Sequence, residues 1–180
     1  SLYCDAADDA KRMAYRTVLD TLFHALVRYA APVLVFTAEE IWGTRFPDTG
    51  SVHLLEWPEV DAGWMDRELN LTWISLREQR SAVTEAIEPL RRDKTIGSSL
   101  EAEVEISDLG GILGGYHNVD LAEVFISSHV RQTAGLNNEI RVTKTTHHKC
   151  TRCWRHLPDF TADGALCSRC DQVVAAMDAP

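Results

Sequence analysis

Two closely spaced cysteine pairs near the end of the chain constrain its fold more than any other feature. Two residues separate the thiols within each pair, and thirteen residues lie between the pairs. Two intervening residues let both sulfur atoms of a tight turn point at one centre, and the loop is long enough to bring the pairs together. Four thiolates at about 2.3 Å form a closed, tetrahedral zinc site. The sequence therefore predicts one structural zinc ion bound by Cys150, Cys153, Cys167 and Cys170.

Other roles for these cysteines fit the sequence less well. Two disulfides would need an oxidising compartment, and nothing in the chain resembles a secretory signal. A redox-active pair would need only one Cys-x-x-Cys motif in a βαβ context. His147, His148 and His156 lie near the first pair and offer alternative zinc ligands, but the set of four thiols is already complete. We expect the fifth cysteine, Cys4, to be a small buried or half-buried hydrophobic residue.

The composition indicates a globular protein with an uneven distribution of charge. Of the 180 residues, 45% are hydrophobic and 25% are charged, and no apolar run approaches the length of about 18 residues that spans a bilayer. The formal net charge of −9 argues against a protein that coats nucleic acid through its overall charge. Residues 141–156, however, contain five cations, three histidines and no carboxylate. We expect a cytoplasmic protein without a membrane partner, with a local basic stripe beside the zinc module.

Hydrophobic periodicity predicts helices in the first half of the chain. Apolar residues recur at three- and four-residue steps over residues 14–29, which indicates an amphipathic helix. Pro32 cannot continue that helix, so a second helix is expected over residues 33–42. A third, long helix is predicted over residues 66–92. Because the chain starts at Ser1 and enters a helical pattern almost at once, we expect a piece of a longer protein.

The period changes in the second half of the chain. Apolar and polar residues alternate over residues 100–107, which indicates a half-exposed strand. Two more strands are predicted over residues 124–130 and 140–145. The glycine-rich segment 109–116 lacks a phosphate-binding motif and indicates a short helix or loop, and a short extended piece is expected over residues 52–55.

Three segments resemble one enzyme family. Residues 31–42, with the sequence APVLVFTAEEIW, resemble a segment of the anticodon-binding helical domain in class I aminoacyl-tRNA synthetases. Residues 93–102, with the sequence DKTIGSSLEA, resemble the junction that follows this domain in the isoleucine, valine and leucine enzymes. The Cys-x-Arg-Cys-Trp motif at residues 150–154 narrows the resemblance to bacterial isoleucyl-tRNA synthetases. The three segments occur in the order expected for this family, so the resemblance extends over nearly the whole chain.

The resemblance implies a fold in three parts and a role within a larger enzyme. A mainly α-helical bundle of the class I anticodon-binding type is expected over residues 1–97, a small α/β junction subdomain over 98–146 and a four-cysteine zinc knuckle over 147–180. A parent of this family charges tRNA(Ile) with isoleucine by using ATP. The ATP-handling signatures and the editing domain are missing from this sequence, so the fragment is predicted to be non-catalytic and to bind no ATP. It would hold the anticodon stem-loop as part of a monomer whose catalytic and editing domains precede it.

Four residues around the first cysteine pair are the candidate tRNA contacts. Anticodon bases can be splayed out and stacked on aromatic or guanidinium planes. The resemblance makes Arg152 and Trp154, both held by the metal-bound turn, the leading candidates for such a contact. Lys149 and Arg155 would add attraction to phosphates. Two alternatives stay open: the cations could neutralise the formal charge of about −2 on a four-thiolate zinc site, and Trp154 could fill the small core of the knuckle.

Two other classes of protein carry comparable zinc modules. Formamidopyrimidine-type DNA glycosylases end in such a finger, but they need an N-terminal catalytic proline where this chain has Ser1, Leu2 and Tyr3. A zinc-ribbon adaptor would present the basic stripe to an acidic protein partner. Binding to isoleucine tRNA, to DNA with an abasic site, or to neither separates the three hypotheses.

Overall fold

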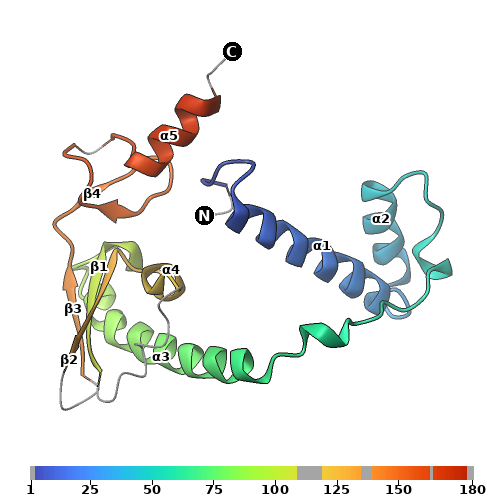
Figure 1. Cartoon of the computed structure of the whole chain (residues 1–180), viewed down its shortest axis with the longest axis horizontal. Helices are drawn as coiled ribbons and strands as arrows, with labels where there is room; N and C mark the ends of the chain where they lie inside the picture. The colour runs from blue at the N-terminus through green and yellow to red at the C-terminus, as the bar shows by residue number, and fades with distance from the viewer. Residues whose placement is uncertain (1–2, 109–118, 135–138, 163, 178–180) are drawn as a thin grey trace. The chain divides into compact units, whose positions relative to one another are not determined.

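The chain folds into two compact units, Ser1–Asp66 and Arg67–Pro180 (Figure 1). The computed structural model describes every residue except 1–2, 109–118, 135–138, 163 and 178–180, so the predicted loop over residues 109–116 lies outside the described residues. Each unit has a hydrophobic core of its own. Among the described residues, no helix combines the length and the apolar composition needed to cross a bilayer.

Two helices form about half of the first unit and confirm the predicted pattern. Helix α1 spans Ala10–Ala30 and helix α2 spans Val35–Arg45. The side chain of Asp9 caps α1 by accepting hydrogen bonds from two backbone N–H groups of its first turn, at 2.9 and 3.1 Å. Pro32 lies in the turn between the helices, where its missing N–H group costs no helical hydrogen bond.

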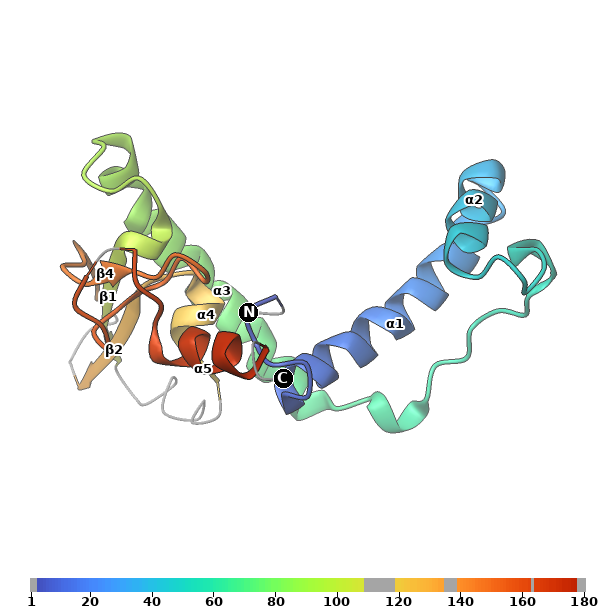
Figure 2. The same cartoon turned by 90° about the horizontal axis from the view of Figure 1, so that it is seen from above.

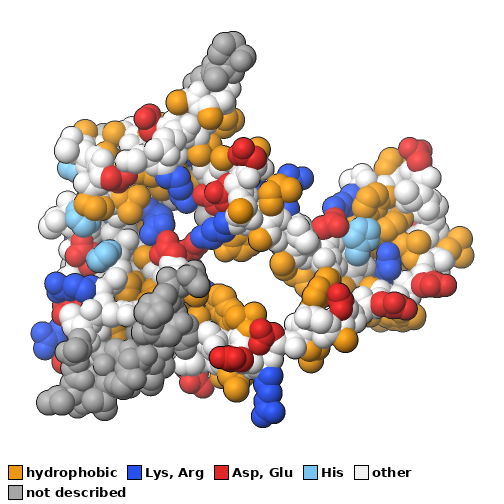
Figure 3. Space-filling view, in the orientation of Figure 1, with side chains coloured by type: hydrophobic (Ala, Val, Ile, Leu, Met, Phe, Trp, Pro, Cys, Tyr) orange, Lys and Arg blue, Asp and Glu red, His pale blue; other side chains and the backbone are white. Residues whose placement is uncertain are grey.

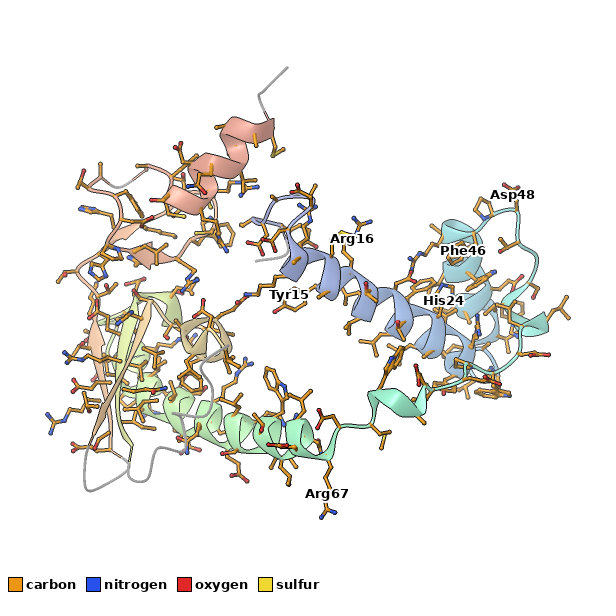
Figure 4. All side chains as sticks on the ribbon, in the orientation of Figure 1. Tyr15, Arg16, His24, Phe46, Asp48 and Arg67 are labelled. Carbon is orange, nitrogen blue, oxygen red and sulfur yellow. The ribbon has the colours of Figure 1, made fainter. Side chains whose placement is uncertain are left out.

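An aromatic cluster joins the two helices. Trp42 of α2 is 5% exposed, and its indole Nε1 donates to the Thr49 hydroxyl at 3.1 Å. The ring of Phe46 lies 4.6 Å from that of Trp42 and stacks at 5.4 Å on His24 of α1 (Figure 4). The other buried members of this core are Val27, Ala31, Ala38 and Val52.

The predicted extended piece over residues 52–55 is wrong. Val52–Leu54 forms a 3₁₀ helix, η1, and a second 3₁₀ turn, η2, spans Ala62–Trp64. The carboxylate of Glu39 accepts hydrogen bonds from the Ser51 hydroxyl at 2.8 Å and from the Val52 N–H at 3.1 Å. Contacts of this kind hold the chain in a tight turn, and a local sequence pattern does not reveal a partner twelve residues away.

Helix α1 leaves most of its apolar stripe at the surface of its unit. Val27 is the one buried residue of this helix, whereas Val18, Leu22 and Leu26 are 56, 47 and 63% exposed. Figure 3 shows hydrophobic side chains along the surface of the helix. Large apolar patches of this kind are rare on isolated soluble domains and typically mark sites of contact.

The second unit is built from one long helix on a mixed sheet. Strand β1 (Ala102–Asp108) lies between its two neighbours and pairs in parallel with β2 (His129–Ala134) and antiparallel with β3 (Ile140–Lys144). Val104 of β1 lies opposite Val130 and Val142 in the pairing register. Figure 2 shows α3 beside the sheet. The elements are α3 (Arg67–Arg92), η3 (Ser99–Glu101), β1 (Ala102–Asp108), α4 (Leu121–Phe125), β2 (His129–Ala134) and β3 (Ile140–Lys144).

The core of the second unit lies between α3 and the sheet. Leu76, Val83 and Ile87 of α3 are 0 to 2% exposed. They form one cluster with alternate residues of β1, namely Ala102, Val104 and Ile106. The predicted long helix and the alternating strand are therefore confirmed, and they bury their apolar faces against each other.

The predicted strand over residues 124–130 is wrong at its start. The side chain of Asp120 accepts a hydrogen bond from the backbone N–H of Glu123 and begins the short helix α4. An acidic residue three positions after such a cap is a helix-start signal. The strand begins only at His129, because the first apolar residues of the predicted strand, Val124 and Phe125, belong to the helix.

Candidate metal centre

The four cysteines lie in a small module, residues 147–177, that follows β3. Two short strands pair antiparallel, with His148 opposite Leu157, and a helix closes the module. Cys150 directly follows the first strand, Cys153 lies in the turn after it, Cys167 directly precedes the helix and Cys170 lies in its first turn. The elements are β4 (His148–Lys149), β5 (His156–Leu157) and α5 (Ser168–Met177), none of which the sequence analysis predicted.

The sulfur atoms have the spacing of a tetrahedral metal site. All four lie within 4.8 Å of one another, and the sulfurs of Cys153 and Cys167 are 3.8 Å apart. A tetrahedron with metal–sulfur distances of about 2.3 Å has edges of about 3.8 Å, whereas a disulfide bond is about 2.05 Å long. No cysteine forms a disulfide. The residues therefore fit a metal ion, and the alternative of two disulfides is not supported.

No histidine of the described residues belongs to the cluster. The metal-competent group consists of the four cysteines alone. The ring Nδ1 of His156 lies 2.9 Å from the backbone carbonyl oxygen of His147, which holds that ring against the hairpin. The alternative ligand set with a histidine in place of a thiol therefore has no support.

The environment opposes the ionisation of two thiols and favours that of a third. Burial raises the pKa of Cys167 to about 12 and also raises the pKa of Cys153. Burial acts in the same direction on Cys150, but backbone N–H groups of Cys153, Cys167 and Arg152 lower the pKa of Cys150 to about 6. A bound cation would supply the positive charge that lets the thiols of Cys153 and Cys167 ionise.

Arg152 lies close to the sulfur cluster. Its Nη1 is 3.8 Å from the sulfur of Cys170, and the backbone N–H of Cys167 donates to the sulfur of Cys150 at 3.3 Å. Four thiolates with one Zn²⁺ would carry a formal charge of about −2, which nearby donors stabilise. Neutralisation of this charge by Arg152 therefore has a geometric basis, while its contact with tRNA stays a prediction.

Trp154 presents its ring to solvent from a strained backbone position. It is 62% exposed, and its φ of 64° lies in the left-handed region that costs a residue with a Cβ about 1–2 kcal/mol. The Trp154 N–H donates to the carbonyl oxygen of Cys150 at 2.9 Å and closes the turn. The amino group of Lys149 lies 5.8 Å from the ring centroid. A ring so exposed does not fill the core of the module.

The basic stripe does not form one positive surface, because acidic side chains from outside it, two of them distant in sequence, pair with three of its cations. The sequence between residues 141 and 156 contains no carboxylate, but the fold brings carboxylates beside it. Arg155, predicted to contact phosphates, is among the paired cations, and its tRNA contact remains a prediction. The pairs are Arg141 with Glu139 at 3.1 Å, Lys144 with Glu101 at 3.6 Å and Arg155 with Asp120 at 3.1 Å.

Two residues that the sequence analysis missed attach the cysteine module to the sheet subdomain. Asp120 pairs with Arg155, and the Ser128 hydroxyl donates to the carbonyl oxygen of His156 at 2.8 Å. The Asp-x-x-Glu pattern signals Asp120 as a helix cap. No local pattern signals its second role or that of Ser128, because both partners lie 28 or more residues further along the chain.

Comparisons with known proteins identify the family. Residues 1–106 match the family model described as the anticodon-binding domain of tRNA ligases. This match covers more than half of the chain, and the chain belongs to that family.

Three similar proteins are tRNA ligases of one kind, the isoleucine–tRNA ligases. The isoleucine–tRNA ligase of Zymomonas mobilis is 53% identical to this chain over 178 residues, which is 96% of the chain. The isoleucine–tRNA ligase of Gluconobacter oxydans is 46% identical over 187 aligned positions, covering 98% of the chain. That of Brachyspira hyodysenteriae is 35% identical over 96% of the chain. The chain spans only 19 to 20% of the length of these relatives.

Proposed function

We propose that this chain recognises the anticodon stem-loop of tRNA(Ile) as the C-terminal part of an isoleucine–tRNA ligase. The whole ligase would use ATP to charge this tRNA with isoleucine, and this part would be non-catalytic. The family match and the likeness to isoleucine–tRNA ligases support the proposal. The single observation that supports this site is the exposed ring of Trp154 in a strained backbone conformation. Two cysteines of the cluster precede this residue in the turn, and Arg155, which pairs with Asp120, follows it.

The recognition step follows from the physics of stacking. A base splayed out of the anticodon loop can stack on the Trp154 ring, at about 1–3 kcal/mol per base. Arg152 and Lys149 lie near the same turn and would add attraction to the RNA backbone. The net charge of −9 keeps non-specific binding to nucleic acid weak, so specificity would come from the shape of this small surface.

The proposed metal is Zn²⁺, held by Cys150, Cys153, Cys167 and Cys170. An all-thiolate tetrahedral set selects zinc or iron, and a closed set of four protein ligands is structural. We expect elemental analysis of the protein to find one zinc ion per chain. Substitution of Cys170 by serine should abolish this stoichiometry, and substitution of Cys4 by serine should preserve it. Protein that is fully folded without stoichiometric metal would contradict the assignment.

The exposed stripe of α1 supports a larger helical bundle of the class I anticodon-binding type. The chain spans about a fifth of the length of its relatives. Most of a ligase as long as those relatives would therefore lie outside this chain. We propose that other helices of the same polypeptide cover Val18, Leu22 and Leu26, and that the whole enzyme acts as a monomer. Burial of such apolar side chains stabilises a bundle by about 1.5–3 kcal/mol each.

Competition binding tests the function directly. The zinc-loaded full-length protein is bound to labelled tRNA(Ile), and the competitors are its anticodon stem-loop, the same stem-loop with a changed anticodon and DNA with an abasic site. We expect the matched stem-loop to compete at least about tenfold better than the changed one, in line with one lost base contact. Preference for the DNA would support a glycosylase-type finger, and binding to neither would support a protein adaptor; either outcome would refute the proposal.

A further inference from the structure

One carboxylate outside the cysteine module joins two parts of the second unit. The Oδ1 of Asp120 accepts a hydrogen bond from the Glu123 N–H at 3.2 Å and caps α4. The Oδ2 of the same side chain accepts a hydrogen bond from Nη1 of Arg155 at 3.1 Å. A single residue therefore connects the start of α4 to the residue that directly follows Trp154.

A second contact lies at the other end of α4. Ser128 is 2% exposed, and its hydroxyl donates to the carbonyl oxygen of His156 at 2.8 Å. Its backbone N–H donates to the carbonyl oxygen of Ala102 in the sheet, also at 2.8 Å. The consecutive residues Arg155 and His156 are thus held by the two ends of the segment 120–128, which includes α4 (Figure 1).

These contacts constrain Trp154 from its C-terminal side. On its N-terminal side, Cys153 belongs to the four-sulfur cluster. Between these two points the backbone of Trp154 adopts a left-handed conformation, with a ring that is 62% exposed. Such strain persists only where the surrounding structure holds the residue in place. The turn is closed on the hairpin by two backbone hydrogen bonds, from the Trp154 N–H to the carbonyl oxygen of Cys150 at 2.9 Å and from the Cys150 N–H to that of Arg155 at 3.0 Å. The ion pair with Asp120 ties the Arg155 side chain of this turn to the segment 120–128.

We propose that Asp120 is a positioning residue for the stacking of an RNA base on Trp154, an inference that rests on the proposed function. Asp120 acts through Arg155 and does not touch the RNA. Simple electrostatics predicts the opposite effect, since removal of a carboxylate lowers repulsion of phosphates and frees the Arg155 guanidinium to attract them. Weaker binding after loss of the carboxylate is therefore the result that distinguishes positioning from charge.

The test is a double-mutant cycle between Asp120→Asn and Trp154→Ala in the zinc-loaded full-length protein. Asparagine is a good helix cap, so α4 is retained while the charged partner of Arg155 is lost. Binding of the tRNA(Ile) anticodon stem-loop is measured for each variant. We expect Asp120→Asn to weaken binding about fivefold when Trp154 is present, and to cause no further loss beside Trp154→Ala.

A matched control removes a comparable ion pair from the same unit. Glu105 accepts from Arg131 at 2.7 Å on the sheet, and Glu105→Gln should change binding by less than about twofold, as expected of exposed pairs. Arg155→Gln breaks the contact with Asp120 from the other side and should show the same dependence on Trp154. Zinc content and the unfolding midpoint are measured for each variant, so that a folding defect is identified as such.

The outcomes separate this inference from the proposed function. Unchanged or tighter binding by Asp120→Asn, or an equal loss with and without Trp154, overturns the positioning role. If the Asp120→Asn variant loses zinc, Arg155→Gln becomes the deciding variant. It must then weaken RNA binding only when Trp154 is present, and unchanged binding overturns the positioning role. If Trp154→Ala alone leaves binding unchanged, the proposed function fails; if it weakens binding and Asp120→Asn does not, only the present inference fails.

Discussion

Replacing Trp154 by glycine is expected to remove recognition of the anticodon loop while making the cysteine module more stable than it is with alanine at that position. Loss of one stacked base costs about 1–3 kcal/mol, or about fivefold to 150-fold in affinity. Glycine adopts the left-handed conformation, observed here at φ 64°, without the clash of a Cβ atom. Alanine keeps that clash. The two variants should therefore bind equally poorly but differ in stability by about 1 kcal/mol.

The measurement pairs RNA binding with unfolding followed through zinc release. Trp57 provides the control, because it is also 62% exposed but lies in the first unit; Trp57→Ala should leave discrimination between matched and changed anticodons intact. The stacking role is refuted if Trp154→Gly discriminates as well as the unsubstituted protein. The strain argument fails independently if alanine is as stable as glycine.

Removal of the metal is expected to unfold the cysteine module and leave the rest of the chain folded. Within residues 147–177, the buried described residues are Cys150, Cys167 and Cys170, so the module has no apolar core to hold it without metal. Structural zinc contributes about 10–16 kcal/mol in isolated small modules. The α3–sheet core and the aromatic core of the first unit share none of these residues.

Hydrogen exchange measured before and after chelation locates the change. We expect amide protection to disappear after about Thr145 and to persist in α3 and β1, with zinc addition restoring it. Cys167→Ser should reproduce the chelated state, and Cys4→Ser should match the unsubstituted protein. A loss of helicity throughout the chain on chelation would show that the module and the two cores fold as one.

The parts of the fold that follow from local periodicity were predictable. Repeats of three and four residues identify α1 and α3, and Pro32 separates α1 from α2. Strict alternation identifies β1. One failure comes from a distant partner that competes with local preference, and the other from a local helix cap that outweighs an apolar run. Glu39 holds residues 51–52 in a tight turn, and the Asp120 cap converts an apolar run into α4.

The candidate site divides in the same way. Cysteine spacing alone identifies the four thiols that the fold brings within 4.8 Å. Spacing does not show that Trp154 has a positive φ and an exposed ring, because the turn geometry depends on the hairpin that β4 and β5 form. Nor does composition show that the basic stripe is largely paired, since its carboxylate partners Glu101 and Asp120 come from other segments.

The amino-acid sequence by itself determined the set of four clustered thiols, the long helices and the resemblance to a tRNA ligase, because each depends on residue identity at short, regular spacing. Tertiary structure alone decided which carboxylates pair with the cations of the stripe and which residues contact the turn that carries the tryptophan. Those outcomes depend on side chains up to 43 residues apart in sequence (Glu101 and Lys144), and the distance between such atoms is set only when the chain has folded.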